Sequence, residues 1–108
     1  SVRNGEFRYT YSRTFRSEPD VYAMQGYDSG LLLRQGLEAV QGDTGKRDQF
    51  YGAMEAAVID SPRGRWRMGK AHNPVQDIYL RTVANGENRI IGVAAKALED
   101  SGAGCKLA

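Results

Sequence analysis

The chain has 108 residues, of which 41% are hydrophobic and 26% are charged, so it can form one domain with a modest core. Fifteen basic and thirteen acidic residues leave a net charge of only +2, and this balance argues against nucleic acid as a partner. The apolar runs are far shorter than the roughly 20 residues that a membrane-spanning helix needs, and the single cysteine, Cys105, excludes a disulfide within the chain.

The first predicted element is a helix over residues 4–16. Aromatic residues recur on it every four positions, at Phe7, Tyr11 and Phe15, and such a stripe is typical of a helix face that packs in a core. Pro19 follows shortly afterwards and prevents the helix from continuing.

The stretch of residues 20–37 is predicted to be a short strand that turns directly into a helix. Residues 21–24 (VYAM) form a compact apolar run, and Gly26 interrupts it. From Tyr27 the apolar positions follow a helical period until Gly42, a natural residue after a helix end. The face expected to pack consists of Tyr27, Gly30, Leu33, Leu37 and Val40. A helix that starts at a sheet edge directs its free N–H groups to the place where α/β proteins bind ligands.

A second helix is predicted over residues 46–57, and the pattern then changes from helices to strands. The predicted strands are residues 65–68, 75–83 and 89–94, separated by a turn at 60–64, a loop at 69–73 and a hairpin turn at 85–86. In the first strand, Trp66 and Met68 share one side and two arginines the other. Asn85-Gly86 is the strongest short hairpin signal. From Ala95 onward we expect a short helical turn and then a Gly-rich tail.

Residues that could perform chemistry are sparse and scattered. His72 is the lone histidine and has no neighbouring cysteine, so neither a metal site nor a cofactor is expected. Nothing in the spacing pairs His72 with Cys105 as a catalytic dyad, and no glycine cluster matches a phosphate-binding loop. The sequence therefore predicts no catalytic residues and no enzyme activity.

The order and spacing of several short strings resemble the C-terminal part of type I periplasmic solute-binding proteins. These are the solute-binding subunits of ABC importers, here of the branched-chain amino acid class. The similar positions are Phe7, Tyr11, Phe15, residues 19–23 (PDVYA), residues 25–28 (QGYD), Leu32, Leu37, residues 61–64 (SPRG), His72, Val75 and residues 79–81 (YLR).

The resemblance implies an α/β fold class: the C-terminal portion of a protein with two Rossmann-like lobes joined by crossover strands. Residues 1–73 would complete the first lobe. Residues 74–81 would be the third crossover, with hinge residues Ile78, Tyr79 and Leu80, and residues 82–108 would form a hairpin and tail of the second lobe. The implied partners are the missing N-terminal portion and an ABC permease, and the implied location is periplasmic or otherwise extracytoplasmic. Such proteins have no catalytic residues.

The family position of Tyr22 implies contact with the apolar part of a solute in the cleft between lobes, and Gln25 and Met24 are adjacent candidates. An aromatic ring offers large contact area, and Gln25 could donate to a carboxylate. The alternative for Tyr22 is a place in the core of the sheet. The expected solute is a small molecule bearing a carboxylate, either a branched-chain amino acid or an aromatic acid, with a preference for the aromatic class.

Two other functions remain open from the sequence. The chain could belong to the ligand-sensing domain of a receptor with the same fold, or it could be a small module that binds a protein partner. A crossover strand without its neighbours would leave sheet edges and apolar surface uncovered. We therefore expect these residues to need another polypeptide segment, or an assembly, to cover them.

Overall fold

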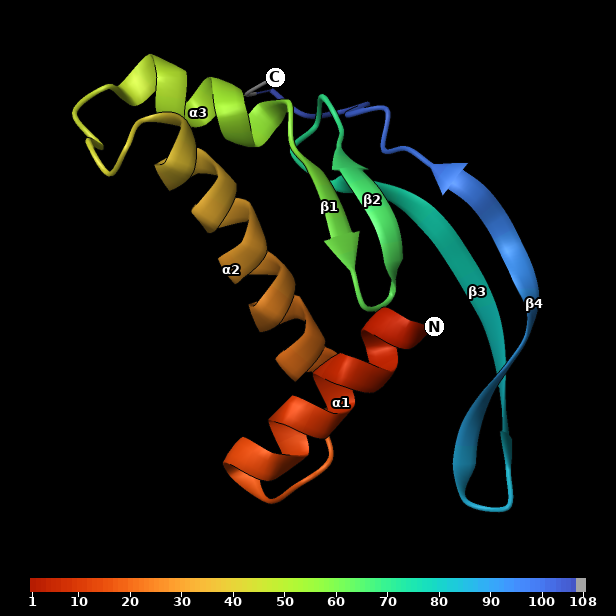
Figure 1. Cartoon of the computed structure of the whole chain (residues 1–108). Coiled ribbons are helices and arrows are strands. Elements are labelled where there is room, and N and C mark those ends of the chain that lie inside the picture. The colour runs from red at the N-terminus through yellow and green to blue at the C-terminus, as the bar shows by residue number, and fades with distance from the viewer. Residues whose placement is uncertain (107–108) are drawn as a thin grey trace.

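The computed structural model describes residues 1–106, which form three helices followed by an antiparallel sheet of four strands (Figure 1). The helices are α1 (Val2–Phe15), α2 (Val21–Ala39) and α3 (Arg47–Glu55). The strands are β1 (Val58–Ser61), β2 (Gly64–Met68), β3 (Pro74–Ala84) and β4 (Glu87–Leu98), and they lie in the sheet in chain order. Within the described residues, no helix combines the length and the apolar character needed to cross a membrane.

Helix α1 confirms the helix predicted near the start of the chain. The Ser1 hydroxyl accepts a hydrogen bond from the Asn4 N–H and so caps its first turn. At the other end Arg16 adopts a left-handed conformation, with φ of 55°, and its N–H donates to the Ser12 carbonyl. The aromatic stripe is only partly a core face, because Phe7 is buried whereas Phe15 is 61% exposed.

The strand predicted over residues 21–24 is wrong, because these residues form the first turn of α2. Asp20 precedes them in extended conformation, and its Oδ1 accepts a hydrogen bond from the Ala23 N–H at 2.8 Å. An aspartate at this position satisfies one of the free N–H groups of a helix start. That cap and the following helical pattern outweigh the strand preference of Val21 and Tyr22.

Helix α2 packs only in part through the face that was predicted. Of the predicted face, Val40 at the helix end is buried as expected, whereas Leu33 is 48% exposed. The face that meets the sheet carries Leu31 and Leu32, which pack against a buried cluster. That cluster consists of Ala57, Ile59 and Trp66. One turn further along, Gly36 is buried against α3.

The sheet begins with a tight hairpin that the sequence revealed only in part. β2 confirms the strand predicted at residues 65–68, with Trp66 buried and its neighbouring arginines exposed. β1 was not predicted, and it pairs with β2 from Val58↔Arg67 to Ser61↔Gly64. β2 then pairs with β3 at only two positions.

The hairpin of β3 and β4 confirms the strand expected over residues 75–83 and its turn. Asn85 and Gly86 have φ angles of 53° and 74°, both in the left-handed region. A two-residue hairpin turn requires such angles when its twist matches the right-handed twist of the two strands. The helical turn expected from Ala95 is wrong, because β4 continues as a strand to Leu98. Ala95 pairs with Ile78, and the long partner strand overrides the helix preference of this alanine-rich segment.

The tail after β4 is attached to the loop between β2 and β3. The Asp100 carboxylate accepts hydrogen bonds from the Gly102 N–H at 2.9 Å and from the Asn73 side-chain amide at 2.8 Å. Both hydrogen bonds lower the pKa of Asp100 because they favour its ionised form, and the bond from the Gly102 backbone has the larger effect. Cys105 lies beyond this attachment and is exposed.

The described residues are spread out rather than compact. Their radius of gyration is 16.1 Å, whereas a compact domain of this length would have about 13 Å. The β3–β4 hairpin stands away from the helices (Figure 1). Most of its large apolar residues are exposed, among them Leu80, Val83 and Ile91, which are 54%, 77% and 60% exposed. β4 has a strand neighbour on one edge only.

The contact of α2 with α3 at Gly36 generates a stability prediction. A Cβ at this position would lie 2.8 Å from Phe50 Cε2 and 2.9 Å from Met54 Cγ, closer than van der Waals contact allows. Gly36→Ala should therefore lower the free energy of unfolding of the full-length protein by about 1–2 kcal/mol, measured by chemical denaturation.

Gly52→Ala on α3 is the matched control, because a Cβ there would meet no atom within 4 Å. Alanine favours a helix over glycine by about 1 kcal/mol, so this variant should be slightly more stable than the parent protein. Equal stabilisation by both substitutions would contradict the close packing of α2 on α3.

Candidate functional site

The three residues predicted to touch a solute lie together near the start of α2, not at the end of a strand. Tyr22 is 76% exposed, Gln25 is exposed and Met24 is half-buried. Tyr22 and Gln25 are three positions apart and therefore share one face of the helix. Met24 is four positions before the buried Asp28 and lies on the inner side. Their role in binding stays a prediction.

The predicted hinge residues Ile78, Tyr79 and Leu80 lie in the middle of β3. Here β3 has left its pairing with β2, which ends at Val75, and continues with β4 alone. Ile78 is 37% exposed and Leu80 is 54% exposed. A two-stranded ribbon is the least supported part of the described sheet, which suits a segment that bends.

A buried carboxylate connects α2 with the β1–β2 hairpin. Asp28 is only 2% exposed, and its Oδ2 accepts hydrogen bonds from Arg63 Nε at 2.6 Å and Trp66 Nε1 at 3.1 Å. The Arg63 guanidinium also lies 5.8 Å from the centre of the Trp66 ring. The Ser61 hydroxyl accepts from the Arg63 N–H and fixes the turn that carries this arginine.

This cluster is a structural anchor that sequence reasoning missed. The helical pattern predicted from Tyr27 places Asp28 at the start of a helix, whereas Asp28 lies about two turns inside α2. A usable signal was Trp66, because a buried indole N–H needs an acceptor and the strand pattern already placed Trp66 inside. The other carboxylate oxygen, Asp28 Oδ1, is buried without a hydrogen-bond partner among the described residues.

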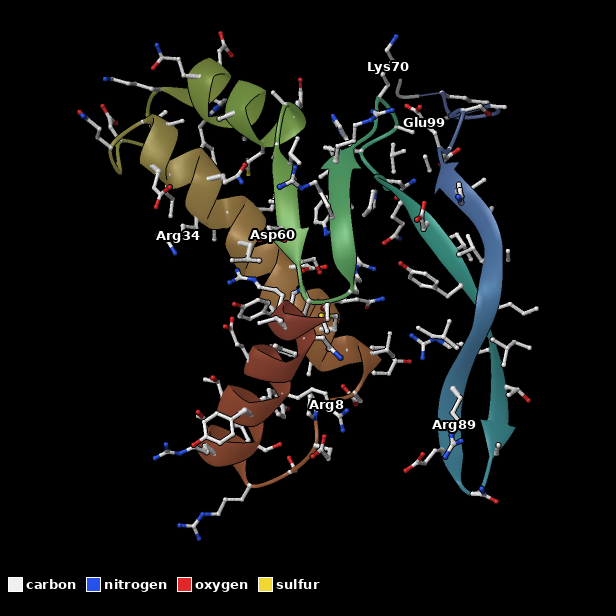
Figure 2. All side chains as sticks on the ribbon, turned by 45° about the vertical axis from the view of Figure 1, so that its right-hand side comes forward. Arg8, Arg34, Asp60, Lys70, Arg89 and Glu99 are labelled. Carbon is white, nitrogen blue, oxygen red and sulfur yellow. The ribbon has the colours of Figure 1, made fainter. Side chains whose placement is uncertain are left out.

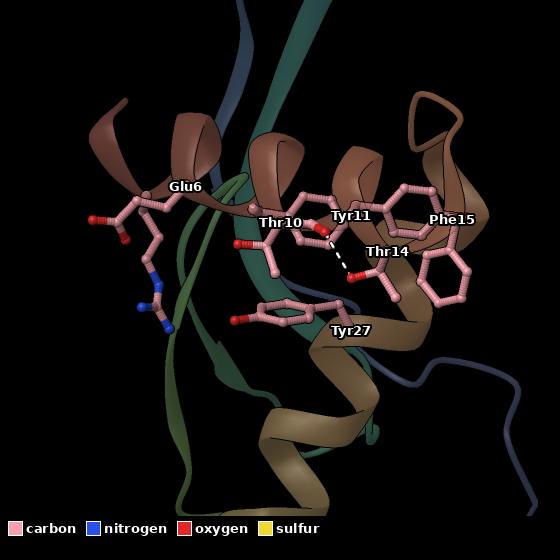
Figure 3. A pocket seen from close by; sticks show the side chains of 8 residues that line it. Glu6, Thr10, Tyr11, Thr14, Phe15 and Tyr27 are labelled. Atoms are coloured by element: carbon pink, nitrogen blue, oxygen red, sulfur yellow. Dashed lines mark hydrogen bonds between the residues drawn. The ribbon is translucent and has the colours of Figure 1, made fainter.

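A groove of about 280 Å³ lies along α1 beside Tyr27 of α2 (Figure 3). Aromatic side chains form one wall of this groove. The centres of the Phe7 and Tyr27 rings are 4.8 Å apart, and the centres of the Tyr11 and Phe15 rings are 4.6 Å apart. Tyr27 comes from α2 and faces the row of side chains on α1 (Figure 3). The stripe predicted as core is thus mostly the wall of an open groove.

A second groove, of about 420 Å³, follows the outer face of α2 and is almost wholly apolar. Gly30, Leu33 and Leu37 line it, so the middle of the face that the sequence predicted to pack is open in the described residues. Arg34 borders the groove and points away from the sheet (Figure 2). The hydrogen bond to Glu38 raises the pKa of Arg34 above its usual value.

The described residues contain no group of three or more histidine, cysteine or acidic side chains that could hold a metal ion. His72 is exposed, and its Nε2 lies 3.5 Å from Glu55 Oε1, which is exposed as well. The two grooves offer contact with aromatic and apolar groups.

Comparison with known proteins decides the family. The family model described as "Periplasmic binding protein" matches residues 2–88. The chain belongs to the periplasmic binding protein family.

A solved relative adds detail to this membership. The crystal structure of a solute-binding protein of an ABC transporter from R. palustris, in complex with benzoate, is 42% identical to this chain with a TM-score of 0.91. The likeness covers 98% of this chain and 29% of that chain, so this periplasmic binding protein sequence spans less than a third of its relative's length. No curated protein sequence gives a significant match. The predicted family and α/β fold class are confirmed.

The Asp28 anchor generates a prediction about stability. Arg63→Gln removes the cationic partner of a buried carboxylate, so the free energy of unfolding of the full-length protein should fall by about 2–3 kcal/mol, measured by chemical denaturation. The ion pair of Arg34 with Glu38 is exposed, so Arg34→Gln is the control and should change stability little. Small, equal effects of the two substitutions would show that Asp28 does not depend on Arg63.

Proposed function

We propose that this chain is part of the solute-binding component of an ABC importer, which captures a small carboxylate-bearing solute in a cleft between two lobes. The observation that carries the proposal is the 42% identity over 98% of the chain to a solute-binding protein of an ABC transporter. Identity at this level, spread over nearly every described element, favours a shared role as well as a shared fold.

Aromatic carboxylates are the solute class that we favour over branched-chain amino acids. The relative binds benzoate, a carboxylate on an aromatic ring. Tyr22 at the start of α2 offers an exposed aromatic face, and Gln25 on the same side of the helix offers an amide donor. A ring that packs on Tyr22 and a carboxylate that accepts from Gln25 would match both features.

The division of the chain within the whole protein follows the same proposal. Residues 1–73 close the first lobe, residues 74–81 form the third crossover, and residues 82–108 belong to the second lobe. Two features support the first two of these assignments. The apolar groove on the outer face of α2 is suited to the sheet of a lobe, and β3 leaves β2 after Val75 as a strand that crosses between lobes would.

On this proposal the protein acts without a catalytic step. It binds its solute outside the cytoplasm, closes around it and delivers it to an ABC permease in the membrane. Binding free energy that is realised only in the closed form drives the closure, because a ligand shifts a conformational equilibrium by its difference in affinity for the two states.

The proposal predicts which solutes the full-length protein binds. Isothermal titration calorimetry should detect benzoate with a Kd of about 1 µM or lower, and leucine should bind at least about 100-fold more weakly. The reversed order would move the protein to the amino acid class. Binding of neither solute class would contradict the function, and a receptor's sensor domain of the same fold would then be the better account.

The proposed contact residue predicts a separate result. Tyr22→Ala should weaken benzoate binding by about tenfold or more, because the loss of an aromatic contact at a binding site costs more than 1 kcal/mol. Tyr51→Ala is the control, since Tyr51 on α3 is 49% exposed and lies on another helix. An unchanged Kd in the Tyr22→Ala protein would remove this residue from the site.

A further inference from the structure

The β3–β4 hairpin is irregular in one part of its length. The eight steps from Gln76 to Ala84 on β3 are matched by eleven steps from Leu98 to Glu87 on β4. β4 therefore carries three extra residues, each at a bulge. A bulge bends the strand that contains it and increases the local twist, so the longer strand runs on the outside of a curve. β4 curves strongly along β3 in Figure 1.

The bulges are concentrated at the predicted hinge. The pairing shifts between Gln76 and Ile78, between Ile78 and Tyr79, and between Leu80 and Arg81. From Arg81 to the turn, the two strands pair residue for residue. The hairpin thus has an irregular base around Ile78–Leu80 and a regular outer part. Bulged residues do not take part in the ladder of hydrogen bonds between the strands. Bending at the base of the hairpin therefore disturbs fewer of these hydrogen bonds than bending elsewhere.

A side chain holds the first bulge in place. Asp77 lies opposite two residues of β4, Lys96 and Ala97, and its Oδ1 accepts a hydrogen bond from the Ala97 N–H at 2.9 Å. Ala97 has a φ of 46°, in the left-handed region that residues with a Cβ rarely adopt. The Asp77 carboxylate thus takes the place of a missing strand partner and stabilises a strained backbone conformation.

We propose that the hydrogen bond between Asp77 and Ala97 fixes the bend at the base of this hairpin and so limits how widely the two lobes open. This inference rests on the proposed function, because it needs residues 74–81 to connect the lobes. With the hydrogen bond in place, the free protein samples a narrow range of lobe orientations close to the one that captures the solute. Without it, the bulge loosens, the free protein samples more orientations, and closure around the solute becomes less favourable.

The test measures the range of orientations directly by double electron–electron resonance on the full-length protein. Spin labels are attached to cysteines that replace Asp48 on α3 and Asn88 near the hairpin turn, in a background from which free cysteines, including Cys105, are removed. Both positions are exposed, and they lie on opposite sides of the bulges. Asp77→Ala should broaden the distribution of distances between the labels and weaken benzoate binding by about three- to tenfold.

Two matched variants separate the hydrogen bond from other effects of the substitution. Asp77→Asn keeps an oxygen that can accept from the Ala97 N–H, so it should retain the narrow distribution and the parent affinity. Ala97→Val keeps the N–H but disfavours the left-handed conformation, so it should broaden the distribution as Asp77→Ala does. Thr82→Ala, in the regular part of the hairpin, should change neither readout.

The outcomes distinguish this inference from the proposed function. Parent-like distance distributions in both Asp77→Ala and Ala97→Val would overturn the role of this hydrogen bond, whatever the solute. Broad distributions with an unchanged benzoate affinity would also overturn it, because the opening would then be independent of capture. If the parent protein binds no benzoate, the solute assignment fails, and the distance distributions alone decide whether the hydrogen bond limits the bend.

Discussion

Helix α2 has two apolar faces, and the described residues cover only one of them. The inner face carries Leu31 and Leu32 and packs on the buried cluster around Trp66. The outer face, with Leu33 and Leu37, lines an open apolar groove. A helix that is apolar on opposite sides is typical of the inside of a larger protein. We propose that the rest of a two-lobed binding protein covers the outer face.

The remaining elements are arranged around this helix by polar contacts. Asp28 fixes the β1–β2 hairpin against the inner face through hydrogen bonds from Arg63 and Trp66. β2 in turn pairs with the start of β3. The start of α2, with the proposed solute contact Tyr22, is therefore connected through a partly buried ion pair to the strand proposed as the hinge. Since buried polar groups hold one geometry more strictly than apolar contacts do, this arrangement positions the solute contact relative to the hinge.

The sequence predicted most elements correctly and failed where local and tertiary effects compete. The Asn85-Gly86 turn and the alternation around Trp66 carry their own geometry, so both were correct. The strand expected at Val21 was wrong because the Asp20 cap outweighs a short apolar run. The strand predicted over residues 89–94 was too short because its continuation depends on pairing with β3, which local sequence does not reveal. The Asp28 anchor was missed because it joins segments 35 residues apart, which no periodicity reveals.

The dependence of this chain on the rest of the protein can be measured by producing residues 1–108 alone. Differential scanning calorimetry and sedimentation velocity would then report whether they fold as a unit. Our account predicts no cooperative unfolding transition and self-association through the uncovered apolar surfaces, whereas the full-length protein melts cooperatively. A monomer of residues 1–108 that unfolds in a single sharp transition would contradict the account.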